Sequence, residues 1–222
     1  MTFLLLIRCI LFIISFVAIS MITHKSFFDV SKWWTLILNI CNIITIIILF
    51  YTYKKKNIKF SELINNKSRQ KNIREVFTWS IIICLVGLLG MYVIGFIIYN
   101  QIPYTPEIIM QPIPIILAVL NIFILPLTTT IAEEGLYLSL GVNQIDNKYK
   151  AIIVPTFFYA LQHSFLPMIL DYKYIIYRFC SFIPVILLMC IYFYKKRKLL
   201  PVMAGHYVIN LATVIQILII SI

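Results

Sequence analysis

Long apolar runs separated by short polar stretches make up most of this sequence. Runs of about 20 apolar residues are long enough to cross a bilayer as helices. The expected spans are about residues 2–22, 33–53, 76–99, 115–140, 151–170, 174–194 and 199–222. Because a chain in hydrocarbon must satisfy its backbone hydrogen bonds internally, the pattern predicts an all-α polytopic membrane helix bundle with about seven transmembrane helices.

The polar stretches between these runs predict the orientation of the chain. Lysine and arginine gather in residues 54–75 and 195–198, whereas residues 100–114 contain neither. Cytoplasmic loops carry the excess of basic residues, so we expect both clusters and the N-terminus to be cytoplasmic. We divide the chain into an N-terminal two-span region with a basic cytoplasmic loop, residues 1–75, and a membrane core, residues 76–222.

Composition changes this picture little but excludes other classes of protein. With 62% hydrophobic and 12% charged residues, a soluble globular core is excluded. The net charge of +11 lies in the loop clusters, which indicates topology and contact with membrane lipids, not with nucleic acid. The five cysteines are scattered singly and form no metal or redox motif. The abundance of isoleucine, lysine and asparagine is typical of AT-rich bacterial genomes, so we expect a multi-pass protein of a bacterial cell membrane.

Two adjacent carboxylates, Glu133 and Glu134, lie inside the fourth apolar run. A charged side chain in hydrocarbon costs roughly 2.5–3.5 kcal/mol on the most lenient scale, so such residues are functional-site candidates. Two of the three histidines, His163 and His206, also lie within expected spans. Since each polar group in lipid needs a partner, we expect the glutamates and these histidines to form one site.

Helical spacing sets two polar pairs on common faces. Tyr159 and His163 are four residues apart, as are His206 and Asn210, so each pair can face one centre. A carboxylate and an imidazole that share a water can act as a general base, and a second histidine with an asparagine can donate hydrogen bonds to an oxyanion. The same side chains suit a zinc ion, with Glu133, His163 and His206 as its ligands. Spacing leaves both chemistries open.

At these residues the sequence resembles the CAAX protease and bacteriocin-processing family of intramembrane proteases, also called the CPBP or Abi family. That family carries Glu-Glu-x-x-x-Arg on one span, Phe-x-x-x-His on the next, and His-x-x-x-Asn or Asp on a later one. The matching segments here are Glu133-Glu134, Tyr159-Ala160-Leu161-Gln162-His163 and His206-Tyr207-Val208-Ile209-Asn210. Order and spacing agree over about residues 115–215, with tyrosine in place of the family phenylalanine.

The resemblance implies hydrolysis of a peptide bond within the membrane. It assigns water activation to Glu133 and His163, the oxyanion hole to His206 and Asn210, and a catalytic place beside them to Glu134. A metal-free glutamate mechanism is favoured, which requires no cofactor, and zinc remains open. The expected partners are a peptide or membrane-protein substrate and membrane lipids, with no nucleic acid. A peptide pheromone, a bacteriocin precursor or a regulatory membrane protein would suit a bacterium.

One position departs from the family pattern. The motif arginine would fall at residue 138, where this chain has Leu138. On an α-helix residue 138 would pair with Glu134, so Glu134 must stay protonated, bond a hydroxyl such as that of Thr130, or meet a cation from elsewhere. The departure leaves open a catalytically silent relative that acts in bacteriocin self-immunity or as a membrane scaffold. The carboxylates themselves also leave open a transporter or proton relay. We expect an arginine restored at residue 138 to raise the activity of a weakened protease.

Overall fold

The computed structural model describes residues 2–57, 72–101 and 109–222, and every regular element within these ranges is a helix. The elements are α1 (Thr2–Thr23), α2 (Phe27–Ser31), α3 (Trp34–Lys55), α5 (Ile73–Tyr99), α6 (Ile115–Glu133), the π-helix η2 (Glu134–Gly141), the 3₁₀-helix η3 (Val142–Gln144), α7 (Lys148–His163), α8 (Tyr172–Lys196) and α9 (Leu200–Ser221). The predicted all-α bundle is confirmed. Parts of the basic loop 54–75 and of the linker 100–114 lie outside the described residues.

Six of the described helices are long and apolar enough to cross a membrane, so the chain is a multi-pass membrane protein. They are α1, α3, α5, α6 with its continuation to Gln144, α8 and α9. The remaining expected span, residues 151–170, overlaps α7, which has 16 residues and ends at His163. Pro167 lacks the backbone N–H that would bond the His163 carbonyl in a continued helix. Arg178 donates to that carbonyl instead, at 3.3 Å.

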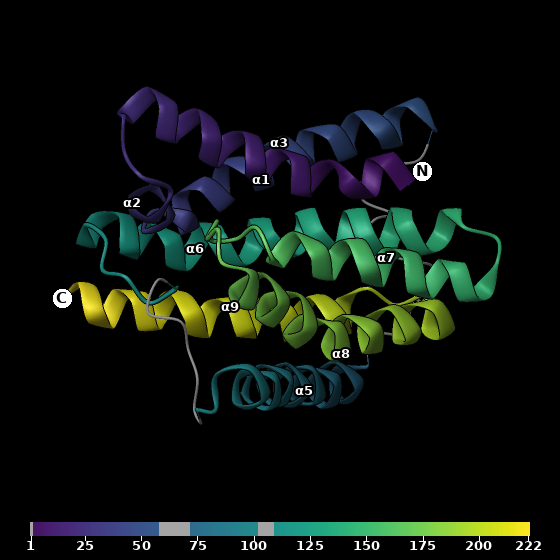
Figure 1. Ribbon diagram of the computed structural model, residues 1–222. Coiled ribbons are helices and arrows are strands. Elements are labelled where there is room, and N and C mark those ends of the chain that lie inside the picture. Colours follow the sequence, from purple (N-terminus) through teal and green to yellow (C-terminus); the bar gives the residue numbers. More distant parts are fainter. Residues whose placement is uncertain (1, 58–71, 102–108) are drawn as a thin grey trace.

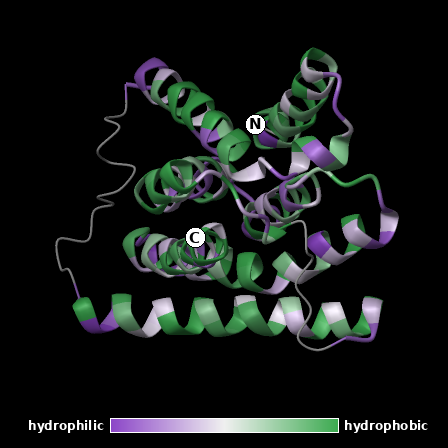
Figure 2. Ribbon diagram, turned by 90° about the vertical axis from the view of Figure 1, so that its left-hand side faces the viewer, coloured by the Kyte–Doolittle hydropathy of each residue, from purple (hydrophilic) through white to green (hydrophobic). Residues whose placement is uncertain are grey.

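The long helices cross at different angles. In Figure 1, α1, α6 and α9 run across the view, with the N-terminus at one end and the C-terminus at the other. Helix α5 is seen almost end-on in Figure 1 and lengthwise in Figure 2, so it crosses these helices steeply. A Cβ on Gly90 of α5 would lie 2.5 Å from the Ser181 carbonyl oxygen of α8, and one on Gly205 of α9 would lie 2.9 Å from the Cβ of Ile83. These glycines therefore let the helices approach closely.

Large apolar side chains cover much of the outer surface. Helix α5 is the clearest case, and Figure 2 shows it as mostly hydrophobic along its length. Its most exposed apolar side chains are Ile73, Phe77, Leu85, Leu89 and Ile97. Soluble proteins rarely expose contiguous apolar surface on this scale, so this face suits contact with lipid.

The basic parts of the described chain share one end of the bundle with the N-terminus. Figure 1 places the N-terminus, the end of α3 and the connection from η3 to α7 together. The last turn of α3 carries Lys54 and Lys55. A common side for these groups agrees with the charge pattern; that this side faces the cytoplasm stays a prediction.

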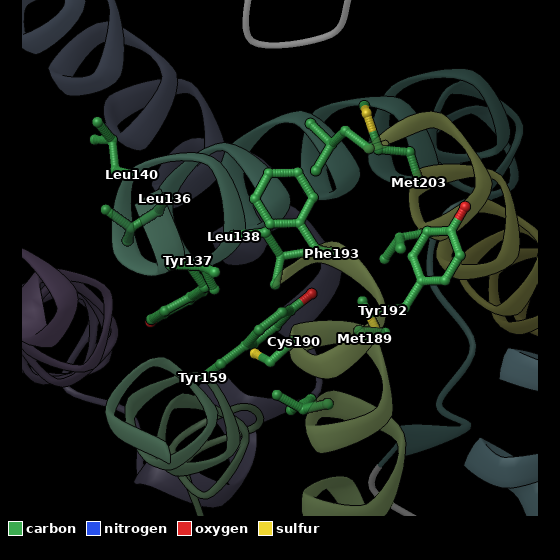
Figure 3. Packing of buried hydrophobic residues seen from close by; sticks show 14 of the residues in the cluster. Leu136, Tyr137, Leu138, Leu140, Tyr159, Met189, Cys190, Tyr192, Phe193 and Met203 are labelled. Carbon is green, nitrogen blue, oxygen red and sulfur yellow. The ribbon is translucent and has the colours of Figure 1, made fainter. Parts of the chain in front are cut away.

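A buried polar site lies between two clusters of apolar side chains. The first cluster surrounds η2, α7 and α8, and Figure 3 shows Tyr137, Tyr159 and Phe193 within it. The second joins α1, α3 and much of α6. On α1, Arg8 falls between Leu5 of the first cluster and Phe12 of the second. The polar residues are thereby held at the junction of two packed apolar regions.

Candidate active site

The two glutamates lie at the junction between an α-helix and a π-helix. Glu133 is the last residue of α6, and Glu134 is the first residue of the π-helix η2. π-helical turns are rare and frequently occur at functional sites. Their backbone bonds join residues i and i+5, so side chains four apart no longer stack as they do on an α-helix. The expected alignment of residue 138 with Glu134 therefore does not hold, and Leu138 is fully buried in the first apolar cluster.

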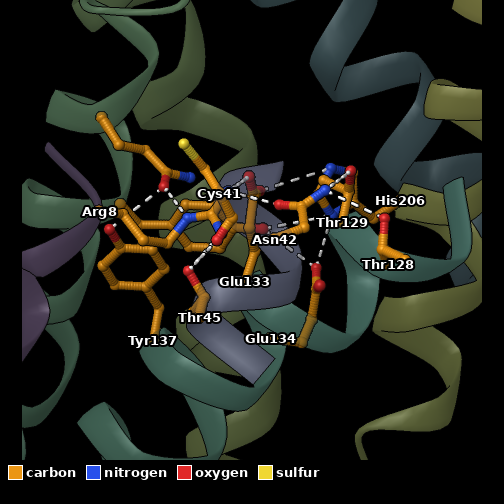
Figure 4. Close-up of polar contacts among 12 residues, drawn as sticks. Arg8, Cys41, Asn42, Thr45, Thr128, Thr129, Glu133, Glu134, Tyr137 and His206 are labelled. Atoms are coloured by element: carbon orange, nitrogen blue, oxygen red, sulfur yellow. Dashed lines mark hydrogen bonds and ion pairs between the residues drawn. The ribbon is translucent and has the colours of Figure 1, made fainter. Parts of the chain in front are cut away.

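Glu133 pairs with an arginine from the first helix. Nη2 of Arg8 lies 2.8 Å from Oε1 of Glu133, and both side chains are almost wholly buried. The sequence left open that a cation from another part of the chain pairs with Glu134. Arg8 is such a cation, but it contacts Glu133 and not Glu134. The other nitrogens of Arg8 donate to Gln162 and Thr45, and Nη2 also donates to Asn42, as Figure 4 shows in part.

A second layer of polar contacts holds the partners of Arg8. Asn42 donates to the hydroxyls of Thr128 and Thr129, one turn before Glu133 on α6. The Tyr137 hydroxyl donates to Oε1 of Gln162 at 3.2 Å. Buried polar groups of this kind are costly unless they are hydrogen-bonded. The network therefore fixes α1, α3, α6 and α7 relative to one another around Glu133.

Glu134 has different partners. Nδ1 of His206 lies 2.7 Å from Oε1 of Glu134, and the Tyr159 hydroxyl donates to the same oxygen at 3.1 Å. An ionised carboxylate only accepts hydrogen bonds, so Nδ1 of His206 is the donor when Glu134 is ionised. The Thr130 hydroxyl instead donates to the carbonyls of Pro126 and Leu127, so it is not the partner of Glu134.

His206 lies between the two carboxylates. Its Nδ1 bonds Glu134, and its Nε2 is 3.8 Å from Oε2 of Glu133. Oε2 of Glu133 and Oε2 of Glu134 are both buried and have no hydrogen-bond partner among the described residues. Each glutamate therefore has one engaged oxygen and one that remains available. An available carboxylate oxygen beside an imidazole can accept a proton from a bound water.

His163 and Asn210 lie further from the carboxylates. The His163 ring stacks on Phe182, with ring centroids 3.7 Å apart, and lies nearly parallel to Tyr159 at 5.9 Å. No hydrogen bond or ion pair joins His163 to either glutamate within the described part of the chain. Asn210 follows His206 by one turn of α9, and its Nδ2 is buried without a hydrogen-bond partner there.

The expected zinc ligands do not form a ligand set in this arrangement. The described residues contain no group of three or more histidine, cysteine, aspartate or glutamate side chains that could hold a metal ion. Glu133 and His206 adjoin each other, whereas His163 stacks behind Tyr159. We therefore assign no step to zinc, and the need for a cofactor stays a question for experiment.

The residues that the sequence interpretation missed are Arg8, Asn42, Thr45 and Gln162. A signal for the first of them was present. Arg8 is the only charged residue in the first apolar run, and a guanidinium in hydrocarbon is as much a functional-site candidate as a carboxylate. The partner residues on α3 carried no comparable signal, because uncharged asparagine and threonine are common in membrane helices, where they bond neighbouring helices.

Comparison with known proteins bears on the second half of the chain. The model of the family described as type II CAAX prenyl endopeptidase Rce1-like matches residues 115–212. No curated protein and no solved structure matches the chain. The matched range contains Glu133, Glu134, His163, His206 and Asn210, and it excludes Arg8. This match confirms the resemblance drawn from the three motifs, and residues 115–212 are similar to the Rce1-like family of type II CAAX prenyl endopeptidases.

Proposed function

We propose that the protein is an intramembrane endopeptidase that hydrolyses a peptide bond of a peptide or a membrane-anchored protein. One observation carries the proposal: two adjacent buried glutamates each keep Oε2 without a hydrogen-bond partner among the described residues, beside His206. Arg8 contacts Glu133 and His206 contacts Glu134, so each carboxylate has a nitrogen donor beside it. The family match over residues 115–212 supports a protease of this type.

In this proposal the attacking water binds between Glu133 and His206. The 3.8 Å between Oε2 of Glu133 and Nε2 of His206 is too long for a direct hydrogen bond, and a shared water can bridge such a gap. Glu133 takes a proton from the water as the oxygen attacks the carbonyl carbon. When the tetrahedral intermediate collapses, the C–N bond breaks and the proton passes to the leaving nitrogen.

Glu134 acts through His206 in this scheme. A carboxylate bonded to one imidazole nitrogen fixes the tautomer and orientation of the ring, as in hydrolase triads. The bond from Nδ1 of His206 to Glu134 supports that role. The Tyr159 hydroxyl bonds the same Glu134 oxygen and so helps to hold it.

Asn210 and His163 complete the proposed set. The buried Nδ2 of Asn210 is a donor without a partner in the described chain, which suits a group that bonds an oxyanion only during the reaction. The family resemblance assigns His163 to water activation. Because its ring lies beside Tyr159 and not against the carboxylates, we propose that it contacts the water or the substrate from the edge of the site.

The substrate in this proposal is a membrane-associated peptide segment in a bacterial cell membrane. A peptide pheromone, a bacteriocin precursor and a regulatory membrane protein all have that chemistry. We propose that no cofactor is needed, because side chains of the site can fill each proton-transfer and oxyanion role. Lipids surround the exposed apolar faces, and nucleic acid has no part in the reaction.

The experiment that tests the proposal is cleavage of a fluorogenic peptide library by purified protein in liposomes. Glu133→Gln removes the proton acceptor, and we expect it to lower kcat by about 100-fold or more. Glu75→Gln is the matched control, since Glu75 pairs with Lys198 and Tyr192 away from the site. Equal activity of the parent and both variants would sink the mechanism. Full complementation of a deletion phenotype by Glu133→Ala and His206→Ala would instead favour a non-proteolytic role.

A further inference from the structure

Arg8 touches the proposed catalytic glutamate although it lies outside the motifs and outside the family match. We propose that Arg8 is the positioning residue of this site and supplies from α1 a cation beside the Glu-Glu pair, whose motif has Leu138 where the family has arginine. The inference rests on the proposed function, because a positioning role has meaning only if Glu133 takes part in a reaction. It goes beyond that function by bringing the N-terminal helix into the catalytic unit.

Every nitrogen of the Arg8 guanidinium is used. Nε donates to Gln162 at 2.6 Å and Nη1 to Thr45 at 3.1 Å. Nη2 donates to Asn42 at 3.0 Å and to Glu133 at 2.8 Å. These acceptors lie on α3, α6 and α7, and the Arg8 side chain is 0% exposed. Because the guanidinium is planar and its N–H groups point in fixed directions, these contacts restrict the Arg8 side chain to one conformation.

The contacts decide which oxygen of Glu133 is free to react. Arg8 holds Oε1, and Oε2 is the atom that faces Nε2 of His206. Without Arg8 the carboxyl group could turn or bond another donor, and Oε2 would lose its fixed place. A displacement of about 1 Å at a reacting group can lower the rate by about 100-fold.

The charges of the site give a second reason for the assignment. Glu133 and Glu134 are adjacent and almost fully buried, so two carboxyl groups lie close together in an apolar bundle. Nδ1 of His206 bonds Glu134. Among the arginine and lysine side chains that the structure describes, that of Arg8 contacts Glu133 directly. Leu138, at the family arginine position, lies in the apolar cluster and supplies no charge. Arg8 therefore provides from α1 the positive charge that the motif lacks.

Arg8 also joins the end of α6, which carries Glu133, to α7. Its Nε bonds Gln162, the residue directly before His163. Through Asn42 it is linked to Thr128 and Thr129 on the turn before Glu133. Helix α1 is thus connected by polar contacts to the helices that carry the first and second motifs.

The test combines enzyme kinetics with a set of Arg8 variants of the full chain in liposomes. Arg8→Met removes the charge and keeps the length, and we expect it to lower kcat about 100-fold while KM changes only a few-fold. Arg8→Lys keeps a cation and is expected to recover part of the lost kcat. Ser15→Ala is the matched control on α1, because Ser15 contacts Cys41 and lies outside the site network. A purely structural arginine would lower the yield or the melting temperature without this kcat effect and its rescue.

A thermal unfolding cycle tests the Arg8–Glu133 pair without any substrate. Arg8→Met and Glu133→Gln should each lower the melting temperature, because each leaves a buried partner unpaired. The double variant should melt higher than the sum of the two shifts predicts. Additive shifts would overturn the pairing, and the double variant keeps the test possible if Arg8→Met alone folds poorly.

The outcomes separate this inference from the proposed function. Parental kcat in Arg8→Met, together with an inactive Glu133→Gln, would overturn the positioning role and leave the protease standing. A Glu133→Gln variant as active as the parent, or a parent that cleaves no peptide, would overturn the proposed function. In that case the positioning role falls with it, and the unfolding cycle still decides whether the two side chains are coupled.

Discussion

The positive charge beside Glu133 comes from Arg8 on α1 and not from the position after the Glu-Glu motif. This single residue changes the interpretation of Leu138. From the sequence alone, Leu138 indicated a weakened site that lacked its cation. In the structure the carboxylates of Glu133 and Glu134 already have partners, and Leu138 is fully buried in apolar surroundings.

We now expect Leu138→Arg to harm the protein. The guanidinium would enter the apolar cluster that surrounds Leu138, and an unpaired buried charge destabilises by about 3–5 kcal/mol. Leu138→Met, which nearly conserves volume, should cost less than about 1.5 kcal/mol. Thermal unfolding and peptide cleavage measure both effects. Higher activity in Leu138→Arg would restore the interpretation drawn from the sequence.

Asn210 offers a second test at a single residue. Its Nδ2 is buried without a partner in the described chain, so its removal breaks no hydrogen bond of the resting protein. We expect Asn210→Ala to lower kcat by about 100- to 1,000-fold, the usual loss for an oxyanion donor, with little change in melting temperature. Parental kcat in Asn210→Ala would remove Asn210 from the site.

At the scale of helices, the pattern of apolar runs predicted most of what is observed. Six expected spans correspond to the membrane-length helices of the structure, because length and hydropathy decide such elements. The pattern could not predict where α7 ends. The end of this helix depends on Pro167 and on the hydrogen bond from Arg178, and hydropathy reports neither. Nor could it predict the π-helix after Glu133. The assumption of an α-helix at this point misplaced residue 138 relative to Glu134.

Close helix packing on α5 gives a matched pair of variants. A Cβ at position 90 would lie 2.5 Å from the Ser181 backbone oxygen, which cannot move aside easily. At position 87 a Cβ would meet only the ends of two side chains, those of Ile209 at 3.4 Å and Val185 at 3.9 Å. We expect Gly90→Ala to destabilise the protein by about 1–3 kcal/mol, as overpacking does, and Gly87→Ala to be tolerated. Equal melting temperatures for the two variants would contradict this packing of α5 on α8.

At the scale of the whole molecule, the site draws on both halves of the chain. The family match covers residues 115–212 and holds the five site residues foreseen from the sequence. Glu133, Glu134 and His206 do lie together, as their burial in apolar spans indicated. The contributions of α1 and α3 were not foreseen, because contacts between residues more than 80 positions apart leave no spacing pattern to find. Helices α1 and α3 therefore contribute to the site beside residues 115–212, and the division of the chain at residue 75 stays a prediction.

The most direct test of this account is the single-turnover rate of peptide cleavage in liposomes for Glu133→Gln beside Glu75→Gln. We predict that Glu133→Gln is slower than the parent by about 100-fold or more, since the proton acceptor is gone. Glu75→Gln should cleave at the parental rate because its contacts to Lys198 and Tyr192 lie outside the site. Equal rates for the two variants would contradict the account.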